Sequence, residues 1–188
     1  MKNLIITILL ACQFIVGCKS KNDKNTAELS QTSSEILFQV KTTDEDYLEI
    51  FEDGIIPWIS IKDPQPEIDY LIDKDEIVIS KTNAILIIDY PLENSVEVKI
   101  VSNNPDGFTR KELAQKISAE YNRIYKEEEE SAKTKTTPLE QRQGLINRNK
   151  TDGKYGIWGH DIDDLDLSAI ILSKMANGEL KLELIVES

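Results

Sequence analysis

Residues 165–188 read LDLSAIILSKMANGELKLELIVES, and this segment predicts a C-terminal β-hairpin. Its two runs, 165–174 and 179–187, flank Asn177-Gly178, a pair that favours a two-residue type I′ turn because both positions need positive φ. In the second run apolar and charged residues alternate, as in a strand with one buried face. The alternating residues are Leu180, Leu182, Leu184 and Val186 against Lys181, Glu183 and Glu187.

Upstream of this hairpin, short β-branched runs predict further strands. These runs lie at 36–40, 47–51, 55–61, 68–72, 76–80, 84–90 and 96–101. Residues 84–88 (AILII) are apolar throughout, which predicts a central strand covered on both faces. Pro57 places its own run at an edge or a bulge, because proline cannot donate to a strand ladder.

One long helix is predicted to begin after residue 107. Thr109 and Glu112 match a capping box. An apolar stripe at helical spacing follows, and it consists of Leu113, Ile117, Tyr121 and Ile124. The acidic run 127–130 predicts a solvated, fraying helix end, since acids are unfavourable beside a helix C-terminus. Together these elements predict an α+β domain with a mostly antiparallel sheet, one main amphipathic helix and the C-terminal hairpin.

The first residues are typical of a bacterial lipoprotein leader. Lys2 precedes an apolar run over 4–17 that suits a signal-peptide core and is too short to span a bilayer. The tetrapeptide IVGC ending at Cys18 resembles a lipobox, in which the cysteine thiol receives a lipid with fatty acids such as palmitate and becomes the new N-terminus. LLAC ending at Cys12 also fits this pattern, and an ordinary cleaved signal is the other alternative.

We therefore expect a signal peptide at 1–17, a lipidated cysteine and flexible tether at 18–34, and a single α+β domain at 35–188. A long mobile loop is predicted at 131–152, with a short helix around 139–146. The expected location is the bacterial cell envelope, where the chain is lipid-anchored to a membrane and faces the periplasm.

Composition excludes several classes of function. A formal charge of −12 disfavours nucleic-acid binding, because an acidic body repels phosphate backbones. Both cysteines, Cys12 and Cys18, lie in the leader, which excludes thiol catalysis and cysteine metal sites in the domain. A single histidine excludes a two-histidine zinc site. No cofactor is expected, and the expected partners are the membrane, through the anchor, and a protein.

The segment GKYGIWGHDIDDL (153–165) contains the candidate functional residues. It contains the only histidine, one of two tryptophans and several carboxylates. His160 with Asp161 or Asp164 is the candidate catalytic set, since a histidine oriented by a carboxylate serves as a general base. Tyr155, Trp158 and His160 are the candidate binding residues, because exposed aromatic side chains supply apolar contact area.

Asp161, Asp163 and Asp164 are candidate metal ligands because hard cations prefer carboxylates. The EF-hand pattern fails there, since Leu165 and Asp166 occupy positions that need a ligand and a glycine, so no metal is expected. The alternative to any site is a structural turn that leads into the final hairpin. In that case Trp158 fills the core, and His160 is an ordinary hydrogen-bonding residue.

Two separated stretches resemble a family of uncharacterised proteins. The first is GFTRKEL (107–113), which leads through Tyr121, Ile124 and Tyr125 to the glutamate run. The second is YGIWGHD (155–161), after a variable loop. The similarity covers roughly 85–172. No activity is known for that family, so the resemblance implies only that helix and motif belong to one domain and that the loop between them tolerates change.

The preferred hypothesis is a non-catalytic module that binds a protein or another ligand through an acidic, loop-rich face. The alternative is a hydrolase that uses His160 with nearby carboxylates. A third option is a protein that neutralises a toxin or an effector. An enzyme needs His160 in a cleft with a carboxylate within hydrogen-bond reach, whereas a binding module needs an exposed patch or a sheet edge.

Overall fold

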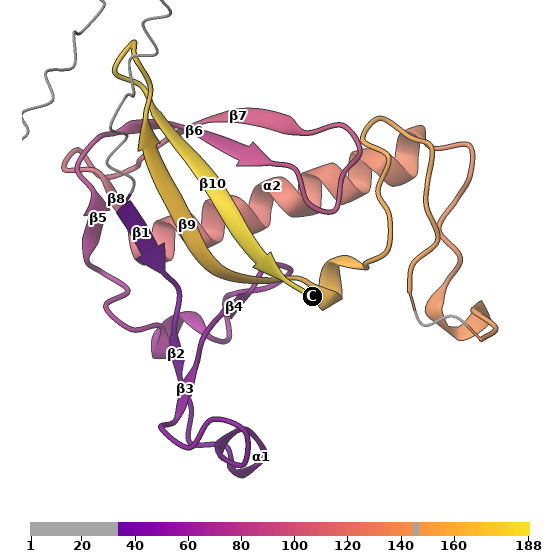
Figure 1. Cartoon of the computed structure of the whole chain (residues 1–188), viewed down its shortest axis with the longest axis horizontal. Coiled ribbons are helices and arrows are strands. Elements are labelled where there is room, and N and C mark those ends of the chain that lie inside the picture. The colour runs from indigo at the N-terminus through magenta and orange to yellow at the C-terminus, as the bar shows by residue number, and fades with distance from the viewer. Residues whose placement is uncertain (1–33, 145–146) are drawn as a thin grey trace, which may run out of the picture. The chain divides into compact units, whose positions relative to one another are not determined.

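The computed structural model describes residues 34–144 and 147–188. In these residues a mixed sheet has the long helix α2 (Arg110–Ser131) against one face (Figure 1). The strands follow the order β1, β9, β10, β6, β7, and the short β4 also pairs with β9. Their bounds are β1 Ser34–Leu37, β4 Ile59–Ser60, β6 Asn83–Ile88, β7 Val96–Val101, β9 Asp166–Lys174 and β10 Leu180–Glu187. All neighbouring strands are antiparallel except β10 and β6, so the predicted α+β class is confirmed.

Smaller elements surround this sheet. Two short ladders join β2 (Val40–Lys41) to β3 (Ile55–Ile56) and β5 (Ile77–Ile79) to β8 (Phe108–Thr109). The run 47–51, predicted as a strand, instead overlaps helix α1 (Glu45–Leu48), because Asp44 caps that helix by accepting a hydrogen bond from the Asp46 N–H at 3.0 Å. The strand predicted at 68–72 is also wrong, because this segment forms the 3-10 helix Ile68–Tyr70 shortly after Pro64 and Pro66.

The predicted C-terminal hairpin is confirmed as β9 and β10, but its predicted turn type is wrong. Gly178 has a φ of 84°, whereas Asn177 does not have a positive φ. The Gly178 N–H donates to the Met175 carbonyl at 2.9 Å, so the connection is a longer turn that ends in a left-handed glycine. The Asn177 side chain accepts a hydrogen bond from the Glu179 N–H at 3.0 Å, which stabilises this turn.

Helix α2 packs its apolar stripe on the sheet. Thr109 caps it by accepting from the Glu112 N–H at 3.3 Å. Only this half of the capping box forms, because the Glu112 carboxylate accepts instead from Ser102 Oγ at 2.8 Å and the Asn103 N–H at 2.7 Å. The buried stripe meets core residues of the strands, among them Leu86, Ile88, Ile170 and Leu182. The predicted stripe of Leu113, Ile117, Tyr121 and Ile124 is thereby confirmed.

The opposite face of the sheet has no cover among the described helices and strands (Figure 1). Successive residues of a strand face opposite sides. Leu86 and Ile88 belong to the core under α2, so Ile85 and Ile87 face the other way. The sequence predicts cover on both faces of this strand; no described helix or strand lies over its outer face, although Ile87 there is buried.

Several predicted features lie wholly or partly outside the described residues. They are the signal peptide at 1–17, the lipidation site Cys18 and the tether up to residue 33. In the predicted loop at 131–152, positions 145–146 are also outside, and a 3-10 helix at Leu139–Gln141 lies where a short helix was expected. Among the described residues, no helix is both long and apolar enough to cross a bilayer.

Candidate functional site

Glu128, in the last turns of α2, holds the start of the candidate segment. Its side chain is 0% exposed and accepts four hydrogen bonds. Thr151 Oγ1 donates at 2.6 Å, and the N–H groups of Gly153, Tyr155 and Gly156 donate at 2.8, 2.7 and 3.2 Å. Burial raises the pKa of Glu128, but these hydrogen bonds outweigh it and the pKa lies below its usual value. The predicted fraying end is therefore wrong, because this acid is an ordered anchor.

Gly153 allows the chain to approach this anchor. A Cβ at Gly153 would lie 2.7 Å from both the carboxyl carbon and the backbone oxygen of Glu128. Gly156, three residues on, has a φ of 67° and turns the chain after the last of the hydrogen bonds. Gly153 thus serves a close approach within the chain itself.

Tyr155, a candidate binding residue, is buried against the same helix. Its hydroxyl donates to Glu127 at 2.5 Å and accepts from Arg123 Nη1 at 3.2 Å. Lys154 Nζ also contacts Glu127, at 2.7 Å. The hydrogen bonds from Lys154, Tyr155 and Arg123 lower the pKa of Glu127 to about 2. Tyr155 therefore fixes the segment to α2 and presents little surface to a partner.

Trp158 and His160, in contrast, form a surface cluster with Tyr90, which lies in the loop between β6 and β7. We call these three residues the aromatic cluster. The ring centroids lie 5.4 Å apart for Tyr90 and Trp158, 5.6 Å for Tyr90 and His160, and 6.3 Å for Trp158 and His160. Trp158 is 40% exposed, and Tyr90 Oη lies 2.8 Å from Ser188 Oγ. The cluster therefore combines apolar area with polar edges.

Backbone hydrogen bonds hold the aromatic cluster in place. The His160 N–H donates to the Trp158 carbonyl at 2.9 Å across Gly159, whose φ is 77°. This γ-turn has the rare positive-φ geometry. The Trp158 N–H donates to the Pro91 carbonyl at 3.2 Å, and Tyr125 Oη donates to the His160 carbonyl at 3.0 Å. The exposed Trp158 and the half-buried His160 thus lie on a backbone that is held from both sides.

The carboxylates that follow His160 bind separate partners. Asp161 accepts from Arg142 Nη1 at 2.6 Å and Nη2 at 3.0 Å, a two-point ion pair with an arginine side chain that is only 6% exposed. Asp164 accepts from the Asp161 N–H at 3.0 Å, and Asp163 pairs with Lys62. No described carboxylate is hydrogen-bonded to the His160 ring, and within the described ranges no three His, Cys, Asp or Glu side chains are grouped to hold a metal.

Sequence reasoning missed the basic residues beneath the segment. Arg148 is 7% exposed, and its guanidinium carbon lies 5.2 Å from the centre of the Tyr125 ring, a cation–π contact. Its Nε and Nη2 atoms have no hydrogen-bond partner among the described residues. Arg142 and Arg148 lie in the loop at 131–152, where no periodic pattern signals burial, so the sequence offered no means of finding them.

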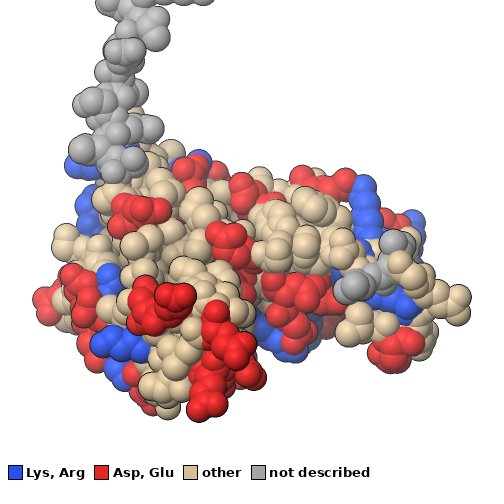
Figure 2. Space-filling view, turned by 60° about the horizontal axis from the view of Figure 1, so that its bottom comes forward, with Lys and Arg blue, Asp and Glu red and all other residues tan. Residues whose placement is uncertain are grey.

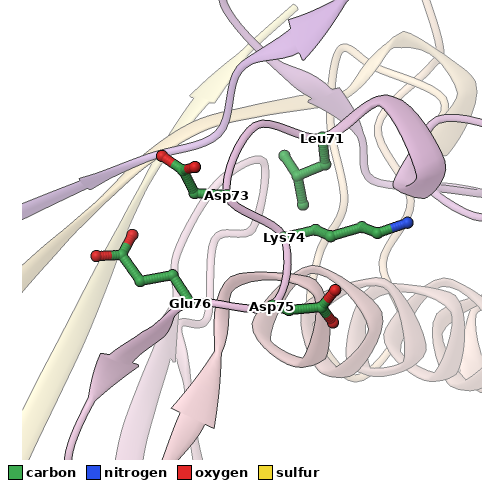
Figure 3. Close-up of a pocket in the computed structure, with 5 residues that line it drawn as sticks. All are labelled: Leu71, Asp73, Lys74, Asp75 and Glu76. Atoms are coloured by element: carbon green, nitrogen blue, oxygen red, sulfur yellow. The ribbon is translucent and has the colours of Figure 1, made fainter.

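A separate depression of about 550 Å³ lies at the turn 71–76, beside the start of α2 (Figure 3). Figure 3 shows Asp73 and Glu76 pointing to one side of the turn and Lys74 and Asp75 to the other. Three of these side chains are in ion pairs, namely Lys74 with Asp69, Asp75 with Lys111 and Glu76 with Arg110. These three ion pairs therefore hold the turn against its surroundings, and none of the six side chains in them is free to bind a ligand.

On the face seen in Figure 2, acidic side chains cover more of the surface than basic ones do. Two exposed aspartates also adjoin the aromatic cluster in the chain, with Asp89 next to Tyr90 and Asp164 shortly after His160, whereas Asp163 is paired with Lys62. The site therefore combines aromatic faces with negative charge, which together attract cations. Comparisons with protein-family models, curated proteins and solved structures found no match. The family resemblance of the helix and the YGIWGHD motif stays a prediction.

Proposed function

We propose that this chain is a lipid-anchored, non-catalytic binding module of the bacterial cell envelope, and that the aromatic cluster binds a basic segment of a partner protein. The observation that carries the proposal is the ring contact of Tyr90, Trp158 and His160 at the surface. Arg and Lys side chains bind such rings through cation–π contacts. The acidic surroundings would draw them in and raise the rate of association.

The ion pair between Asp161 and Arg142 favours binding over hydrolysis. A histidine base needs a carboxylate that orients its ring and stabilises the cation formed during reaction. Asp161, the nearest carboxylate in sequence, already accepts two hydrogen bonds from a buried arginine, and Asp164 accepts from backbone. Both candidates thus support the local fold. A toxin or effector with a basic surface is one class of partner that this site suits.

The proposed anchor rests on the leader sequence that ends at Cys18. In a bacterial host, the full chain should fractionate with membranes and incorporate labelled palmitate. Cys18→Ser should abolish the incorporation of palmitate, and Cys12→Ser should not. Palmitate incorporation that persists in Cys18→Ser would contradict the assignment of this cysteine.

Fluorescence of Trp158 tests the binding proposal. In the full chain with Trp58→Phe, Trp158 is the only tryptophan. We expect a short arginine–glycine peptide to change its emission, with affinity that falls as salt rises. A glutamate–glycine peptide of equal length should have no effect.

Two variants locate the binding surface. Tyr90→Leu should weaken binding of the arginine peptide by about tenfold, which corresponds to loss of one ring contact. Tyr70→Ala removes an aromatic side chain that is exposed elsewhere and should leave the affinity unchanged. Equal binding by both variants, or no response of Trp158 to the arginine peptide, would overturn the proposal.

A further inference from the structure

The outer face of the sheet, which turns away from α2, presents two rows of opposite charge. Strand pairing aligns Lys181 of β10 with Ile85 of β6, and Ile85 with Lys99 of β7. We call these three residues the lysine row. The residues two positions farther along the same strands are aligned in the same manner. They are Glu183, Ile87 and Glu97, and we call them the glutamate row.

Apolar residues extend this face on its β9 side. Ile171 is paired with Glu183, and Ala169 is paired with both Ile185 and Leu37. Ile185 and Leu37 are 42% and 46% exposed. The face also has three glutamates, including Glu35 on β1, against two lysines, so it is almost neutral in a chain of net charge −12. Such a surface differs from the acidic remainder of the molecule and is suited to contact with another almost neutral surface.

The two rows match each other under two-fold symmetry. Two copies can face each other about a two-fold axis. This axis runs across the strands, lies between the two rows and is in the plane of contact, so the glutamate row of one copy lies on the lysine row of the other. Lys181 and Glu183 form an ion pair at 2.8 Å within one copy. In the dimer Glu183 also meets the partner's Lys181, Glu97 meets the partner's Lys99, and Ile87 meets the partner's Ile85. This complementarity is what an isologous interface requires, since one patch must fit itself.

The area of the face is sufficient for a weak dimer. The five strands are four to nine residues long and lie about 4.8 Å apart, and with a rise of about 3.3 Å per residue they give a face of about 500 Å² per copy. The two copies would bury about 1,000 Å² in total, which is at the lower limit for specific interfaces. We infer that the chain forms a two-fold dimer through this outer sheet face, in which the lysine and glutamate rows pair between copies.

The mass of the full-length chain in detergent solution, measured by sedimentation velocity, tests this inference. We expect a dimer with a dissociation constant in the micromolar range, about what such an area supports. The double variants Lys99→Glu/Lys181→Glu and Glu97→Lys/Glu183→Lys should each dimerise about tenfold more weakly, because like charges then face each other. An equimolar mixture of the two should recover a dimer, since an all-glutamate face meets an all-lysine face.

The control is Lys126→Glu/Lys133→Glu, which makes the same charge change at exposed positions outside this face and should dimerise as the wild type does. Circular dichroism tests whether each variant is folded. If a double variant is not folded, the single variant Glu97→Lys is measured in its place. A wild-type chain that is monomeric at about 200 µM would overturn the inference. So would a dimer that is insensitive to all charge reversals. Neither outcome bears on the aromatic cluster, which the peptide titration tests separately.

Discussion

The Glu128 carboxylate accepts a hydrogen bond from the Tyr155 N–H at 2.7 Å, and the two residues are separated by 27 positions in the chain. This contact joins the end of α2 to the start of the segment that carries Trp158 and His160. A charged group without exposure is stable only when its oxygens are fully hydrogen-bonded. The position of the candidate site therefore depends on one buried acid.

Replacement of that acid should strongly destabilise the domain. Glu128→Gln presents an amide NH2 to four hydrogen-bond donors, so at least one of them loses its acceptor. We expect the free energy of unfolding to fall by about 2–4 kcal/mol in urea titrations. Glu130→Gln makes the same change on the exposed side of the helix and should cost less than about 0.5 kcal/mol. Equal costs would contradict the anchoring role.

A methyl group at position 153 should act on the same contact through sterics. Gly153→Ala places a Cβ 2.7 Å from backbone and carboxyl atoms of Glu128, and we expect a cost of about 1–3 kcal/mol. Gly159→Ala meets no atom within 4 Å but must keep its positive φ, so we expect about 1 kcal/mol. Thermal unfolding of both variants gives the comparison. A larger loss for Gly159→Ala would show that backbone strain outweighs the clash.

The raised pKa of the Asp166 carboxyl should make the stability of the domain depend on pH. Burial, with the nearby charges of Glu67 and Glu187, raises the pKa of Asp166 to about 6 in the folded chain, from a usual 3.8. The folded state then binds the extra proton between these values, so stability contributed by this group is present below about pH 4 and is lost as the pH rises to 6. Asp166→Asn should remove that loss.

At pH 7 we expect the Asp166→Asn variant to exceed the wild type by about 1 kcal/mol, a value reduced for the partial exposure of the side chain. Urea titrations at pH 4 and pH 7 measure the difference. Asp106→Asn, at an exposed loop position, is the control and should shift stability equally at both values. A wild-type advantage that grows with pH would reverse the assignment.

The ion pair of Arg142 and Asp161 should restrain the backbone of the aromatic cluster. Arg142→Lys keeps the positive charge but cannot make both hydrogen bonds, so local opening should require about 1 kcal/mol less. We expect faster hydrogen exchange at the Trp158 and His160 amides, with little change in the core of α2. Lys133→Ala, in the same loop, should leave these rates as they are. Unchanged exchange in Arg142→Lys would mean that the backbone contacts alone hold the cluster.

The features that could be predicted from sequence were those encoded by periodicity. The hairpin strands and the stripe of α2 follow from side-chain alternation, which burial on one face imposes. Composition, not periodicity, located the segment with Trp158 and His160, but it did not locate Tyr90, which comes from another part of the chain. The failures arise where local chemistry conflicts with distant contacts. Glu128 lies in an acidic run that resembles a solvated end, and its donors lie 23 to 28 positions later.

The place of β10 in the sheet has a consequence for how the chain folds. β10 lies between β9 and β6, yet it is the last strand in chain order among the described residues. During synthesis, β1, β6 and β7 are made long before the strand that joins their two sides. The sheet therefore closes late and through distant pairings, which makes folding slow. Until then the nascent chain lacks its central ladder, so deletion of 180–187 should prevent folding of the whole sheet rather than trim its edge.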